Sequence, residues 1–169
     1  MKRLIFLALL LPSLAAFSQK QKAEAGFKAE LDQRADSLDP IEGIWNVSSI
    51  QEFYRYDTLY DVARYPKAAR VAVIKRDGKF RSYDMSGAAY EVEFSFTDVK
   101  GVYLYRNFFK ETQEYSKAQA VISREGEMEY TYDFPDNYLR AHFLDTYEEG
   151  TRVTNQLQWV RSYPPSPKR

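Results

Sequence analysis

Residues 39–49 read DPIEGIWNVSS and mark a border in the chain. Residues 19–39 are rich in Ala, Glu, Lys and Gln, which favour helix, but their apolar stripe is thin, so they predict either a helical or a mobile N-terminal lead. Pro40 disfavours helical geometry at the residue before it. After Gly43, apolar and polar residues alternate, which predicts strands. The border therefore separates a lead from a β domain whose strand pattern begins at Gly43.

Strand-like segments follow one another from there to residue 163, mostly joined by tight turns such as Asp77-Gly78. Successive hairpins predict an antiparallel meander, and closing a long meander into a barrel removes its two exposed edges. The sequence thus predicts an all-β fold, a meander closed into a barrel of about 8–10 strands over residues 40–163, with a short N-terminal helix. The alternative is a β-sandwich or open sheet in which Trp45 is an ordinary core residue.

Two segments need a separate interpretation. Residues 57–69 break the alternation and predict either a short helix, which Pro66 would end, or a lid loop. Residues 138–148 alternate, and predict a strand paired with residues 151–163 through a tight turn. The proline-rich residues 164–169 predict a disordered tail.

The N-terminus has the order of a secretory signal peptide. Met1-Lys2-Arg3 precedes the apolar run 4–16, and Ala16-Phe17-Ser18 supplies small residues for cleavage before Gln19. The run is shorter than the ~20 residues that span a bilayer. We expect residues 1–18 to be a signal peptide and the protein to be secreted or periplasmic, with no membrane span after cleavage. The alternatives are a buried helix or a membrane anchor.

The composition limits how the domain is stabilised and which partners it binds. The chain has no cysteine, which excludes disulfides and a lipoprotein anchor, so the core alone must hold the domain. Fourteen Tyr, eleven Phe and two Trp supply large apolar areas for that core. The 24 basic and 24 acidic residues balance, which argues against a nucleic-acid partner.

The start of the first strand carries a family resemblance. Gly43-Ile44-Trp45 resembles the G-x-W motif of the lipocalin and wider calycin superfamily. The resemblance implies a calycin-like barrel in which Gly43 and Trp45 close one end and an Arg from the last strand packs across the Trp ring. Arg161 is the first choice for that cation, and Arg152 is the second.

The resemblance extends to a narrower group. Residues 39–45, DPIEGIW, and Tyr163-Pro164 resemble the start and end of an uncharacterised group of secreted bacterial lipocalin-like domains. Members of that group have no assigned ligand or reaction. The resemblance therefore implies a fold and a compartment only.

No motif for catalysis or metal binding is found. The single histidine, His142, has no serine in a G-x-S-x-G turn to act with. Zinc would need Cys or His clusters. Asp133, Asp136 and Asp145 would suit calcium only if they met at a rim, and turn chemistry already explains Asp136. We expect no enzyme activity, no metal and no cofactor.

The tyrosines give the main functional hypothesis. Tyr130 and Tyr132 share one strand face, and Tyr103 and Tyr105 share a face of another strand. They predict either the wall of a binding pocket or a filled core. The first hypothesis is a barrel that binds a small apolar or amphipathic ligand of unknown identity. The alternative is a filled barrel that acts as an envelope protein–protein interaction module, and an enzyme with an unfamiliar site is the weakest hypothesis.

Removal of the leader is directly testable. N-terminal sequencing of the protein from an envelope or secreted fraction of its host should begin at or within a few residues of Gln19, because signal peptidase cuts after small residues. Full-length protein that stays in the cytoplasm would contradict this.

Overall fold

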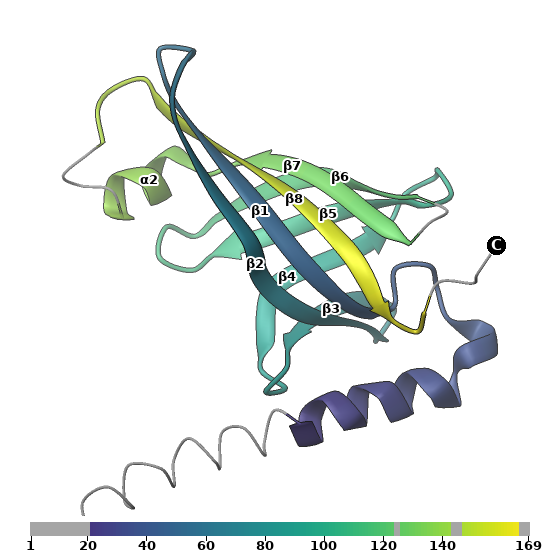
Figure 1. Cartoon of the computed structure of the whole chain (residues 1–169). Helices are drawn as coiled ribbons and strands as arrows, with labels where there is room; N and C mark the ends of the chain where they lie inside the picture. The colour runs from purple at the N-terminus through teal and green to yellow at the C-terminus, as the bar shows by residue number, and fades with distance from the viewer. Residues whose placement is uncertain (1–20, 124–125, 143–146, 166–169) are drawn as a thin grey trace, which may run out of the picture.

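The computed structural model describes residues 21–123, 126–142 and 147–165, so the expected leader and most of the expected tail lie outside the described residues. Eight strands form a closed barrel in chain order, each antiparallel to its neighbours, and the last strand pairs with the first (Figure 1). The expected fold class, a closed antiparallel meander with a short N-terminal helix, is confirmed. The strands are β1 (Gly43–Arg55), β2 (Thr58–Arg76), β3 (Lys79–Asp84), β4 (Ala89–Phe96), β5 (Val102–Phe109), β6 (Glu114–Ile122), β7 (Glu127–Asp133) and β8 (Thr151–Tyr163). A helix over residues 21–33, the 3-10 turn η1 (Ala35–Ser37) and the short helix α2 (Asp136–His142) accompany them.

The interpretation of residues 57–69 as a helix or lid loop is wrong, because β2 runs through them from Thr58 onward. The β1–β2 partners shift from Val47↔Ala69 to Ser49↔Tyr65, so residues 66–68 form a bulge. A bulge accepts Pro66, which has no N–H to donate to a neighbouring strand. The bulge also explains why the alternation of the sequence is interrupted there.

The strand expected over residues 138–148 is also wrong. Residues 138–142, the described first part of this segment, belong to α2. The rings of Tyr138 and His142 stack with their centroids 4.1 Å apart, because residues four apart lie on the same face of a helix. Instead, β8 pairs with β7 and with β1. Apparent alternation over so few residues did not distinguish a helical face from a strand face.

The N-terminal helix covers part of the outer barrel wall. Its Phe27 and Leu31 are buried against the outward-facing side chains of Ile44, Ala72 and Ile74. The neighbouring Val71 and Val73 point into the barrel instead. Both faces of this part of β2 are thus buried, which explains why residues 71–74 read as an unbroken apolar run.

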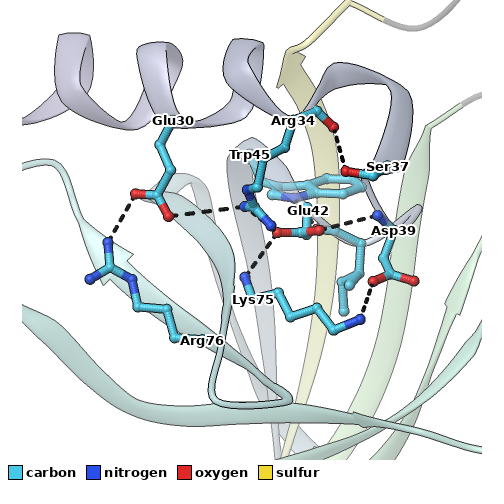
Figure 2. Close-up of polar contacts among 9 residues, drawn as sticks. Glu30, Arg34, Ser37, Asp39, Glu42, Trp45, Lys75 and Arg76 are labelled. Atoms are coloured by element: carbon cyan, nitrogen blue, oxygen red, sulfur yellow. Dashed lines mark hydrogen bonds and ion pairs between the residues drawn. The ribbon is translucent and has the colours of Figure 1, made fainter.

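A buried carboxylate fixes the turn between this helix and β1 (Figure 2). The side chain of Glu42 is fully buried and accepts a hydrogen bond from Arg34 Nη2 at 2.7 Å. It also accepts backbone N–H groups of Lys75 at 2.9 Å and of Asp39 at 3.1 Å. The Asp39 carboxylate pairs in turn with Lys75 Nζ at 2.9 Å. These contacts connect the lead, the turn and β2 at one point, and the buried charge is both paired and hydrogen-bonded.

Trp45 closes the adjacent barrel end. Its side chain has no exposed surface, and its Nε1 donates to the Ile41 carbonyl at 3.0 Å. The Arg161 guanidinium lies over the ring, 4.7 Å from the centroid, and burial lowers its pKa. Trp159 meets Trp45 edge-on with the centroids 6.4 Å apart. The structure therefore brings Trp45 and Arg161 together, whereas Arg152 lies over Tyr54 near the other end of β8.

Gly43 permits the end of β8 to approach the start of β1 closely. Its φ is +152°, and a Cβ there would lie 2.5 Å from the carbonyl oxygen of Tyr163. Any side chain would push β8 away from the start of β1.

We expect Trp45→Ala to lower the free energy of unfolding by about 3–5 kcal/mol, because the ring is fully buried and its removal leaves a cavity. Urea titration followed by circular dichroism measures the change. Tyr60→Ala, at a half-exposed ring on β2, is the control and should cost far less. Equal losses for the two variants would contradict a closing role for Trp45.

Candidate ligand-binding cavity

The barrel interior contains an open cavity of about 450 Å³. Inward-facing side chains of β1, β2, β4, β5, β7 and β8 form most of its wall, and Ser82 of β3 adds to it. The wall includes the exposed residues Tyr65, Ala68 and Tyr90, so the cavity reaches the surface between β2 and β4. The interior is therefore not completely filled by side chains.

Three of the four tyrosines singled out in the sequence line this cavity. The rings of Tyr105 and Tyr130 are 4.4 Å apart between centroids, and Tyr105 stacks on Tyr132 at 5.3 Å. Tyr103 is not part of the wall. It packs edge-on against Phe80 at 5.6 Å, in the filled part of the core near Trp45.

Polar side chains interrupt the aromatic wall at a few points. Ser49 Oγ donates to Asn155 Oδ1 at 2.6 Å, and Asn155 Nδ2 donates to the Tyr132 hydroxyl at 3.0 Å. All three residues line the cavity. The sequence analysis did not identify Ser49 and Asn155. Each lies an even number of residues from a tryptophan of the same strand, and this spacing indicates that both face the barrel interior.

Two other polar groups of the wall have no partner. Ser82 Oγ and Trp159 Nε1 are buried, and neither makes a hydrogen bond among the described residues. The indole N–H lies near enough to Tyr130 to lower the pKa of that hydroxyl, but without the geometry of a hydrogen bond. Buried donors are normally satisfied, so the contents of the cavity, water or a ligand, are the remaining partners for these two groups.

Burial shifts the acid–base behaviour of the tyrosines. It raises the pKa of Tyr105 well above its ordinary value, and the nearby Tyr130 and Tyr132 hydroxyls add to the rise. Burial also raises the pKa of Tyr130 and Tyr132, although Asn155 partly opposes the shift at Tyr132. The pKa of Tyr103 is raised to about 12, first by burial and then by the charge of Asp39. The interior thus disfavours negative charge.

A second cleft, of about 710 Å³, lies outside the barrel at its closed end. Its wall includes Asp39, Glu42 and Arg161. The two carboxylates already pair with Lys75 and Arg34, and the guanidinium lies over Trp45. We favour the interior cavity as the candidate site, because ligand sites are mostly apolar with a few placed polar groups.

The described residues offer no catalytic or metal-binding arrangement that we recognise. His142 is exposed on α2, away from the cavity wall, and its Nδ1 lies 3.1 Å from the Tyr138 carbonyl oxygen. Within the described ranges, no group of three His, Asp or Glu side chains is placed to hold a metal ion. Asp145, one of the three carboxylates considered for calcium, lies outside those ranges. None of the helices in the described part of the chain is long and apolar enough to cross a membrane.

Comparison of the chain with protein-family models, with curated proteins and with solved structures gives no match.

The tyrosine pKa shifts predict an alkaline loss of stability. A Tyr whose folded pKa exceeds its unfolded value of about 10 keeps its proton longer in the folded state, so its contribution is full below about pH 10 and falls as the pH rises toward the folded pKa. We expect the free energy of unfolding, measured by urea titration at a series of pH values, to fall above about pH 10.

Tyr105→Phe should make that alkaline decline less steep, because it removes one buried titrating hydroxyl. Below about pH 9, the curves of variant and parent should run parallel. A parent protein whose stability is constant from about pH 9 to pH 12 would contradict the shifts.

Proposed function

We propose that this protein is a secreted or periplasmic barrel that binds a small apolar or amphipathic molecule. The observation that carries the proposal is the interior cavity, whose volume of about 450 Å³ lies within the 300–1,000 Å³ range of ligand pockets. Flat tyrosine faces offer an apolar surface to a ligand, and the Ser49–Asn155–Tyr132 chain offers polar contacts.

Two sequence features support the compartment and the family. The expected signal peptide, residues 1–18, favours export. The G-x-W resemblance at Gly43–Trp45 favours a calycin-like protein, and the packing of Arg161 on Trp45 agrees with it. Fold resemblance alone does not assign a ligand, so the proposal depends on the cavity.

An interaction module for an envelope protein is the second candidate. The β1–β2 hairpin extends beyond β3, which pairs only with residues 71–76 of β2 (Figure 1), and Tyr56, Leu59 and Tyr60 near the hairpin tip are 69%, 47% and 49% exposed. Exposed apolar groups gathered in one place favour a protein partner. The cavity gives the first candidate the stronger support, because a module that binds by its outer surface has no need of one.

An environment-sensitive apolar dye tests the first candidate. We expect saturable binding of one dye per folded monomer in a fluorescence titration, because the chain encloses one interior cavity of suitable size among its described residues. Tyr132→Ala should change the affinity, since Tyr132 contributes to the wall, while circular dichroism shows a folded protein.

Tyr60→Ala, on the hairpin and outside the cavity wall, is the matched control and should bind the dye as the parent does. Dye binding that is lost in Tyr60→Ala but kept in Tyr132→Ala would favour the interaction module instead.

A further inference from the structure

The cavity wall carries no charged side chain. Every described residue that lines it is apolar, aromatic, or bears a hydroxyl or amide group. An ionised group of a ligand would leave its water shell there and meet only neutral dipoles, which is unfavourable for an unpaired charge. The raised pKa values of Tyr105 and Tyr130 agree, because burial already opposes a negative charge on their hydroxyls.

The two unpartnered polar groups of the wall show what a ligand would have to supply. Ser82 is 1% exposed and Trp159 is 4% exposed, and they belong to different strands, β3 and β8. The indole Nε1–H can only donate, and the Ser82 hydroxyl can donate or accept. An acceptor oxygen can satisfy either group, whereas a purely hydrocarbon ligand leaves both without a partner.

Flat rings bound the space beside Trp159. Tyr130 lies 6.0 Å from Trp159 between ring centroids, and Tyr105 and Tyr132 continue the aromatic surface. Aromatic side chains prefer offset-stacked or edge-on contacts with other rings. A ligand with a planar ring therefore fits this wall.

We propose that the cavity selects an uncharged ligand with a planar apolar body and an acceptor oxygen, a carbonyl or an ether, which receives a hydrogen bond from Trp159 Nε1 or from Ser82 Oγ. This inference rests on the proposed binding function and adds the chemical class of the ligand.

Three probes of matched skeleton separate these requirements. 2-Acetylnaphthalene has the ring and a neutral carbonyl, 2-ethylnaphthalene has the ring without an acceptor, and 2-naphthoate has the ring with a carboxylate. Displacement of the apolar dye measures each affinity. We expect the ketone to bind about fivefold to tenfold more tightly than the ethyl compound, the ratio of one net hydrogen bond. The carboxylate should bind most weakly of the three.

Two variants assign the hydrogen bonds. Trp159→Phe removes the Nε1–H and keeps a ring, and Ser82→Ala removes the hydroxyl. At least one of these variants should lower the affinity for the ketone, and both should leave that for the ethyl compound nearly unchanged. Ser48→Ala, on the outer face of β1 and outside the cavity wall, should change neither. If Trp159→Phe does not fold, Ser82→Ala carries the test alone.

The outcomes are distinct. Tight naphthoate binding, or a ketone-to-ethyl ratio that both variants leave intact, overturns the inference and leaves the binding function standing. Dye binding without displacement by any of the three probes also overturns it. Failure of the dye itself to bind would refute the proposed function, and the inference with it.

Discussion

The contact between Trp45 and Trp159 is the constraint on which the rest of the barrel depends. Trp45 belongs to the first strand and Trp159 to the last, so their edge-on packing joins the two strands that must meet for the meander to close. The backbone supports the same join, because Gly43 lets the end of β8 approach the start of β1. Trp45 then seals the closed end, while Trp159 forms part of the cavity wall.

The sizes of the inward-facing side chains decide where the interior is filled. Near the closed end, Phe80, Phe94 and Met128 are fully buried and leave little space. Further from the closed end several inward positions are smaller, such as Ser49 on β1, Ser82 on β3 and Val92 on β4, and there the cavity opens. One end of the barrel is thus a close-packed core and the other end holds a cavity, although the strand order is the same at both ends.

Much of this arrangement was predictable from the sequence, because alternation reports which residues face inward. It placed Trp45, Tyr105, Tyr130 and Tyr132 on interior faces, and turn residues indicated the meander. Alternation failed in two places. At the bulge near Pro66 its interruption was interpreted as a loop or helix, and in α2 a helical segment was interpreted as a strand. Alternation also left open whether the barrel was hollow. The answer depends on the summed volume of the inward-facing side chains at each level of the barrel, and the sequence does not show which residues of different strands lie at the same level. The missing partners of Ser82 and Trp159 are likewise visible only in three dimensions.

The pairing of β1 with β8 also sets the order in which the chain can assemble. Ser162 Oγ of β8 donates to the Ile44 carbonyl across 118 positions of sequence. Contacts of such long range carry a large loop-closure cost and slow a folding reaction. During synthesis, the earlier hairpins can pair as they emerge, but β1 keeps one unpaired edge until the last strand leaves the ribosome. The barrel therefore cannot close before the last strand has been made, and until then the free edge of β1 is able to pair with other strands or to bind chaperones.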